Sequence, residues 1–200
     1  MEKIYFNFLL LFIPFSCFCQ QKQINPSNKN EVKKEISADA NDKNNLLDWQ
    51  IDIPVGFSII SEGELEDLDF GSKEENSGKE ITTLISFRKG KQNIFTAAYE
   101  SLQDKEKITF EEHKSTSLKV LQEMYSKERI KFDVVNSDLK LGQYDFYKIL
   151  IHMYSQTSKL VLTQEIYSSY ISNHLFTAVI LYEDENLGAI LRENFITSFK

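Results

Sequence analysis

The sequence has few residues of the kinds that carry chemistry. Its 200 residues include two cysteines, three histidines, seven glycines and three prolines. The histidines, His113, His152 and His174, have no His-x-x-x-His or His-x-His spacing, and a zinc site needs three or four converging ligands. We therefore expect no metal site and place these histidines at the surface or at the boundary of the core. The scattered glycines form no phosphate-binding loop, so no cofactor is expected.

A nucleophile motif and an excess of basic charge are also missing. The chain has no Gly-x-Ser-x-Gly sequence, and its two cysteines both belong to the N-terminal apolar segment. An enzymatic activity is therefore not expected. The net charge of -7, from 30 acidic and 23 basic residues, opposes binding to nucleic acid. We expect contact with a membrane only through an N-terminal lipid.

The N-terminus predicts export. The apolar run over residues 4–18 is shorter than the about 20 residues of a transmembrane helix and has the length of a signal-peptide core. Three interpretations stay open: cleavage between Cys19 and Gln20, lipid attachment at Cys17, which follows Ser16, or retention of the segment as an anchor. All three place the remaining chain outside the cytoplasm, in the periplasm or secreted.

Three regions follow from this pattern. Residues 1–19 are predicted to be a signal peptide, and residues 20–45, which are rich in Gln, Asn, Lys and Glu, a disordered linker. Residues 46–200 are predicted to form a single domain. Within it, residues 66–75 match a calcium-binding loop poorly, and we interpret them as a solvated acidic loop.

Alternation of apolar and polar residues predicts seven strands. They cover residues 49–53, 81–87, 94–99, 130–135, 144–154, 159–170 and 175–182. The turn around Gly90 predicts a hairpin, and short turns between the last four strands indicate antiparallel pairing.

Two longer helices are predicted from apolar residues at three- and four-residue spacing. The first begins at a capping box formed by Thr109 and Glu112, and the second covers residues 186–197. A shorter acidic helix is predicted after a second capping box at Ser61 and Glu64. The helical stripes are Phe110, Ser117, Leu118, Leu121, Met124 and Tyr125 in the first helix and Leu187, Ile190, Leu191 and Phe195 in the second.

The predicted fold class is α+β. Residues 144–154 and 175–182 are apolar on both faces, which is typical of central strands covered above and below. We therefore predict one antiparallel sheet of about six to eight strands, with the long central helix on one face and the C-terminal helix on the other.

Tyrosines gather in the C-terminal strands. Tyrosine at a strand edge offers apolar area together with a hydroxyl group that stays wet, which suits the rim of a core or a protein-binding patch. The rim is the favoured interpretation, and the patch is the alternative. The tyrosines considered are Tyr144, Tyr147, Tyr154, Tyr167, Tyr170 and Tyr182.

The order of these elements resembles a known family. The stretches "IDIPVGFSII", "TFEEHKSTSLKVL", "YDFYKILIHMY" and "LRENFITSFK" look like the PsbP-like superfamily, which includes periplasmic lipoproteins and secretion chaperones. The resemblance implies a binding or assembly factor without a shared active site. We therefore expect an exported, monomeric, non-enzymatic domain that binds a protein or an envelope component. The alternative is a carrier of a small ligand or lipid in a groove between sheet and helix.

Overall fold

A computed structural model describes residues 49–61, 64, 81–102, 109–127 and 129–199. These residues form seven strands and two long helices. In chain order they are β1 (Ser58–Ile59), β2 (Ile81–Lys89), β3 (Asn93–Ser101), α3 (Phe110–Lys127), β4 (Lys131–Leu141), β5 (Tyr144–Tyr154), β6 (Leu160–Ile171), β7 (His174–Tyr182) and α4 (Glu185–Thr197).

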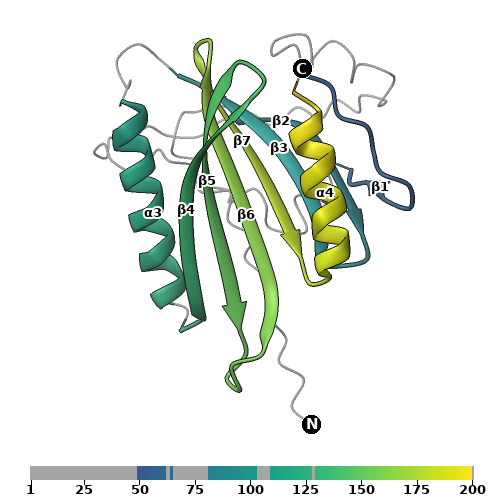
Figure 1. Cartoon of the computed structure of the whole chain (residues 1–200), viewed down its shortest axis with the longest axis vertical. Coiled ribbons are helices and arrows are strands. Elements are labelled where there is room, and N and C mark those ends of the chain that lie inside the picture. Colours follow the sequence, from purple (N-terminus) through teal and green to yellow (C-terminus); the bar gives the residue numbers. More distant parts are fainter. Residues whose placement is uncertain (1–48, 62–63, 65–80, 103–108, 128, 200) are drawn as a thin grey trace, which may run out of the picture.

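The strands make one antiparallel sheet (Figure 1). Their order is β1-β2-β3-β7-β6-β5-β4, so β7 is inserted beside β3 and joins the N-terminal hairpin to the C-terminal meander. The predicted α+β class and sheet size are confirmed. β4 forms one edge of the sheet within the described residues, and the two-residue β1 forms the other.

Local sequence signals fix the turns. The β2–β3 hairpin turns at Gly90, with φ +70°, and the β4–β5 hairpin at Gly142, with φ +57°. Both angles lie in the left-handed region, which glycine adopts without a steric penalty. These two glycines explain why β2 and β4 each end at a tight hairpin turn.

Both predicted capping boxes are present. The Thr109 backbone N–H donates to a Glu112 carboxylate oxygen at 2.8 Å, and the Glu112 N–H donates back to the Thr109 hydroxyl at 3.2 Å. Ser61 and Glu64 make the same reciprocal pair at 3.1 and 3.4 Å. The first box starts α3, whereas the helix predicted after the second lies largely outside the described residues.

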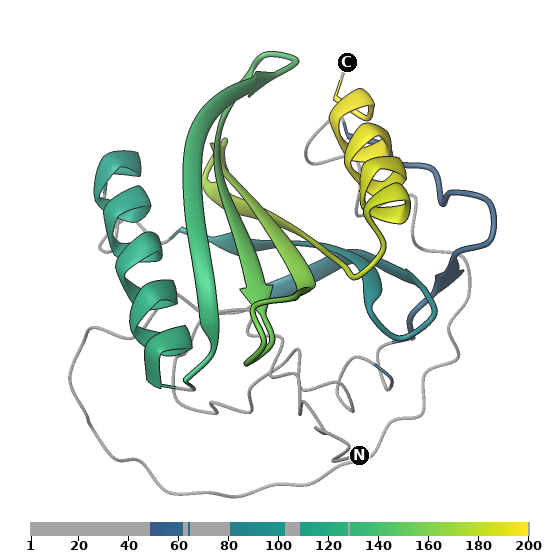
Figure 2. The ribbon, with the colours of Figure 1, turned by 60° about the horizontal axis from the view of Figure 1, so that its bottom comes forward.

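The two helices cover opposite faces of the sheet (Figure 2). On the α4 face, Phe195 lies at the centre of an aromatic cluster, 4.8 Å from the Tyr167 ring and 5.3 Å from Phe199. On the α3 face, Leu121 and Tyr125 pack against aliphatic residues of the sheet. The predicted placement of one helix on each face is therefore confirmed, and the sheet separates two distinct cores.

Three details differ from the predicted pattern. The segment around Trp49 is buried but is not a strand, because its groups bond to the C-terminal helix region: the Trp49 indole donates to the Ser198 hydroxyl at 2.6 Å, and Asn194 donates to the Asp52 carbonyl at 2.7 Å. β4 continues to Leu141, since it pairs with β5 along its whole length. Ile190 is 45% exposed and lies outside the buried stripe of α4.

The described part of the chain contains two long helices, α3 and α4. Neither α3 nor α4 combines the length and the apolar character that a bilayer-crossing helix needs. Three predicted segments lie outside the described residues. They are the signal peptide with Cys17, Cys19 and Gln20, the linker over residues 20–45 and the acidic loop over residues 66–75.

Candidate functional site

A pocket lies between α3 and the sheet. The space between its lining side chains is about 620 Å³, a volume that includes space open to solvent. The helix contributes His113, Ser117 and Leu121, which follow one another at four-residue spacing on one side of α3. The sheet supplies the floor, from residues of β2, β3, β5, β6 and β7.

The strand register orders the floor into rows. Glu100 of β3 lies opposite Leu175 of β7 at the end nearest the start of α3. In the next row on this face, Ala98 lies opposite Thr177, and Thr177 lies opposite Ser168 of β6.

The third row is apolar. Val179 of β7 lies opposite Ile166 of β6, and Ile166 lies opposite Ile149 of β5. The polar side chains of the floor, Glu100, Ser168 and Thr177, therefore lie in the first two rows, and the third row is aliphatic. The first row also contains the apolar Ile81 and Leu175.

The helical wall changes in the same direction. His113 is near the first turn of α3, Ser117 one turn further and Leu121 one turn beyond that. His113 lies near the Tyr170 ring, at 5.7 Å between centroids, whereas Tyr125, beyond Leu121, donates to the Gln164 side chain. These contacts fix the direction of the helix along the sheet, so polar residues of both walls share one end of the pocket.

The placement of His113 differs from the sequence prediction. It is 2% exposed rather than at the surface or boundary, and burial lowers its pKa to about 4. The imidazole is therefore neutral at neutral pH. The Ser117 hydroxyl lies 3.4 Å from its Nε2 atom but donates to the His113 carbonyl at 2.7 Å.

The other histidines lie elsewhere. His174 packs edge-on against Tyr99, with ring centroids 5.0 Å apart, and His152 is in β5 opposite Thr163. Within the described part of the chain, no three His, Cys, Asp or Glu side chains come together to hold a metal.

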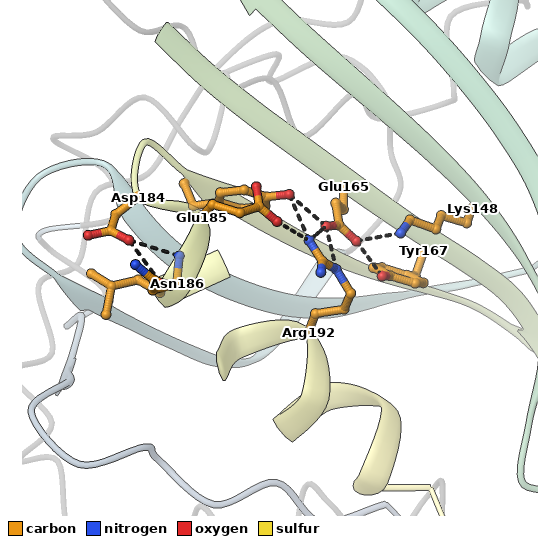
Figure 3. Close-up of polar contacts among 9 residues, drawn as sticks. Lys148, Glu165, Tyr167, Asp184, Glu185, Asn186 and Arg192 are labelled. Atoms are coloured by element: carbon orange, nitrogen blue, oxygen red, sulfur yellow. Dashed lines mark hydrogen bonds and ion pairs between the residues drawn. The ribbon is translucent and has the colours of Figure 1, made fainter. Parts of the chain in front are cut away.

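A second polar cluster lies on the opposite face, under α4 (Figure 3). Glu165 of β6 is fully buried, yet its carboxylate contacts Lys148 of β5 at 2.6 Å and Arg192 of α4 at 2.6 Å. Tyr167 and Tyr182 donate their hydroxyl groups to the same carboxylate. Arg192 also reaches Glu185 of α4 at 3.3 Å. Through the buried Glu165 carboxylate, α4 is joined to β6 and, by Lys148 and Tyr182, to β5 and β7.

This environment fixes the ionisation of the cluster. Burial alone would raise the pKa of Glu165, but hydrogen bonds from Arg192, Lys148 and Tyr167 outweigh it and lower the pKa to about 2. Burial, together with the adjacent Glu165 charge, raises the pKa values of Tyr167 and Tyr182. A carboxylate with such a low pKa is a poor proton acceptor, and its oxygens are already bonded. The cluster therefore holds α4 on the sheet.

The tyrosines singled out from the sequence are divided between the two faces. Tyr147 is buried in the α3-side core, whereas Tyr167 is buried under α4 and Tyr144 packs beside Phe199 on that same side. Tyr154 bonds to Asp133 at 2.9 Å, and Tyr170 contacts the Phe110 ring. Tyr182 is also buried in the α4-side core, so the structure does not bring the six side chains together on one surface.

Sequence reasoning missed the residues that matter most in both clusters. Glu100 and Glu165 occupy inward-facing positions of strands that are otherwise apolar or uncharged on that face. A carboxylate at such a position is seldom buried without a partner, so it could have marked both sites. The sequence does not mark Arg192, the partner of Glu165, in the same way. Its contact with Glu165 depends on how α4 packs on the sheet.

Comparison with known proteins gives a distant structural likeness. The chain matches no protein-family model and no curated protein. Among solved structures, it is similar to the solution structure of cyanobacterial PsbP (CyanoP) from Synechocystis sp. PCC 6803, with 8% sequence identity and a TM-score of 0.47. The likeness covers 74% of this chain and 83% of that chain. No site residue is transferred from it.

Proposed function

We propose that this chain is an exported, non-enzymatic binding domain that holds a small ligand in the pocket between α3 and the sheet. The pocket is the observation that carries the proposal, because its walls are largely apolar and a few polar groups converge at one end. Ligand sites in proteins have this composition. The N-terminal sequence pattern supports a place of action outside the cytoplasm.

The geometry around the pocket favours binding over catalysis. A serine nucleophile needs a base that accepts its proton. Here the Ser117 hydroxyl donates to the backbone carbonyl of His113, and the imidazole is 3.4 Å away. This orientation supports a role for both side chains in lining the pocket.

Filling the pocket is expected to weaken ligand binding. The probe is N-phenyl-1-naphthylamine, an uncharged molecule whose fluorescence rises in apolar surroundings, titrated into the full chain. Ala98→Leu adds bulk to the floor and Ser117→Leu adds bulk to the helical wall. Each substitution should weaken binding about tenfold or more, the equivalent of about 1.4 kcal/mol.

The matched control is Ala189→Leu on the exposed side of α4. It makes the same change in side chain far from the pocket and should bind the probe as the unmodified chain does. Circular dichroism establishes that each variant is folded. Equal probe binding by all three folded variants would rule out the pocket as the binding site.

A protein partner is the second candidate function, favoured by the sheet edge. β4 pairs only with β5 among the described strands, along 11 residues, and Val135 in its middle is 58% exposed. Such an edge offers backbone groups to a strand from another protein. A photo-crosslinking residue at Val135 should then join to one envelope protein, whereas one at the similarly apolar, exposed Ile190 should not. Identical labelling at both positions would count against the edge.

A further inference from the structure

We propose that one end of the molecule docks on an anionic lipid bilayer. This end consists of residues 127–133, from the last residue of α3 into β4, and residues 154–160, around the β5–β6 turn, and we call it the basic end. It lies at the opposite end of α3 from His113, so the inference goes beyond the pocket and does not depend on a ligand there.

The fold brings the two segments of the basic end together. The Arg129 N–H donates to the Ser126 carbonyl at 3.2 Å, and the φ of +56° at Arg129 turns the chain from α3 directly into β4. Lys131 then lies opposite Tyr154 in the β4–β5 register, and its ammonium group donates to the Ser158 hydroxyl at 2.6 Å. The end of α3, the start of β4 and the β5–β6 turn therefore meet at one end of the molecule (Figure 1).

The basic end is positive although the chain is acidic. Its four cations are all exposed: Lys127, Arg129, Lys131 and Lys159. Against them stand Glu128, which lies outside the described residues, and Asp133, which accepts a hydrogen bond from Tyr154 at 2.9 Å. The net charge of this end is +2, and the rest of the chain carries -9 of the total of -7. A molecule with this separation of charge turns its basic end toward a negative surface.

An apolar side chain lies beside these cations. Leu160 follows Lys159 and is 45% exposed. The adjoining turn is closed by its own hydrogen bonds, from the Ser158 N–H to the Ser155 carbonyl at 2.9 Å and from the Ser155 N–H to the Lys159 carbonyl at 2.8 Å. Lysines that meet lipid phosphates, next to an aliphatic side chain that enters the acyl boundary, are typical of surfaces that lie on anionic membranes. A narrow turn suits a bilayer better than a protein partner, which usually contacts about 800 Å² of surface.

The sequence alone did not indicate this surface. It predicted contact with a membrane only through an N-terminal lipid, since the chain as a whole is acidic. Lys159 and Leu160 join the cations at the end of α3 only through the pairing of β4 with β5 and of β5 with β6.

Binding of the full chain to vesicles tests the proposal. One set of vesicles contains equal amounts of phosphatidylglycerol and phosphatidylcholine, and the other contains phosphatidylcholine alone. In 100 mM NaCl, the partition coefficient from cosedimentation should be at least tenfold higher for the anionic vesicles. In 1 M NaCl this preference should fall below threefold, because the Debye length decreases from about 10 Å to about 3 Å. The uncharged apolar run near the N-terminus contributes equally to both partition coefficients and cancels in their ratio.

Substitutions within the basic end locate the contact. Lys131→Gln and Lys159→Gln should each weaken binding to the anionic vesicles about fivefold, the usual contribution of one basic residue near such a surface. Lys140→Gln is the matched control, because Lys140 is also exposed on β4 but lies about 30 Å further along the strand, and it should change binding less than twofold. Leu160→Ala should weaken binding about threefold, whereas Ile190→Ala, at a position that is also 45% exposed, should leave it unchanged.

Three outcomes would overturn the proposal. The first is equal partitioning into both kinds of vesicle, or a preference that persists in 1 M NaCl. The second is an equal loss of binding in Lys131→Gln and Lys140→Gln while circular dichroism shows both variants to be folded. The third is the absence of vesicle binding together with crosslinking of a photo-reactive residue at Lys159 to an acidic envelope protein, which would replace the bilayer by a protein partner.

Discussion

Replacing Glu165 by alanine is expected to lower the free energy of unfolding by about 3 to 5 kcal/mol, the usual result of removing one partner from a buried ion pair. The carboxylate is fully buried, and the side chains of Lys148 and Arg192 are only 20% and 29% exposed. Without Glu165, both cations and the hydroxyl groups of Tyr167 and Tyr182 lose their shared acceptor. Urea denaturation followed by circular dichroism measures the change.

Two further substitutions show how much of this loss of stability comes from the buried charge of Glu165. Glu185 contacts the same Arg192 but its side chain is 69% exposed, so Glu185→Ala should cost no more than about 1 kcal/mol. Glu165→Gln keeps the volume of the side chain and removes only the charge. It should retain most of the destabilisation of Glu165→Ala. A loss of stability in Glu165→Ala no larger than that in Glu185→Ala would contradict the assigned role.

The same carboxylate predicts a pH dependence. Its pKa is about 2 in the folded chain against an ordinary 4.5, so the unfolded chain binds the proton more readily. The stabilisation is therefore complete above about pH 4.5 and is lost as the pH falls toward 2, a difference of about 3 kcal/mol. The stability gap between the unmodified chain and Glu165→Gln should narrow over that interval. A gap that stays constant would place the stabilising interaction elsewhere.

Replacing Phe195 by alanine should be comparably damaging, with a loss of about 3 to 5 kcal/mol. The side chain is fully buried, and its ring lies within 6.4 Å, centroid to centroid, of five aromatic rings of the α4-side core. Truncation leaves a cavity that rigid rings fill poorly. The rings around it are Phe95, Phe146, Tyr167, Phe176 and Phe199.

The adjacent residue provides the control for this substitution. Ile196 is 38% exposed on the same helix, so Ile196→Ala should change the free energy of unfolding by less than about 1 kcal/mol. Thermal unfolding monitored in the near ultraviolet reports both the stability and the packing of the aromatic cluster. Similar melting temperatures for the two variants would show that Phe195 is not at the centre of this core.

Local signals in the sequence predicted most of the elements. The capping box at Thr109 and Glu112 starts α3 because both partners are three residues apart and need no tertiary contact. Residues 144–154 form a long run of strand-favouring residues between two turns, and β5 has the predicted bounds. The strand predicted at Trp49 was wrong. The alternating burial of this segment comes from its contacts with the C-terminal helix region rather than from pairing with another strand.

The pocket and the buried cluster depend on long-range placement. β3 and β7 are separated by more than 70 residues, and only their pairing puts Ala98 beside Thr177. Glu165 and Arg192 meet because α4 packs on β7, the neighbour of β6 in the sheet, and no local pattern encodes this packing. Glu165 and Glu100 could be noticed as charges at inward positions, but their roles required the third dimension.

The joining of Trp49 to the C-terminal region bears on when the domain can fold during synthesis. The Trp49 indole bonds to Ser198, and its ring lies 6.0 Å from that of Phe199, so the first and last described residues close one core. A ribosome makes α4 after every strand of the sheet, and until then the α4 face exposes its aromatic side chains. The native fold is therefore completed only after translation of this region.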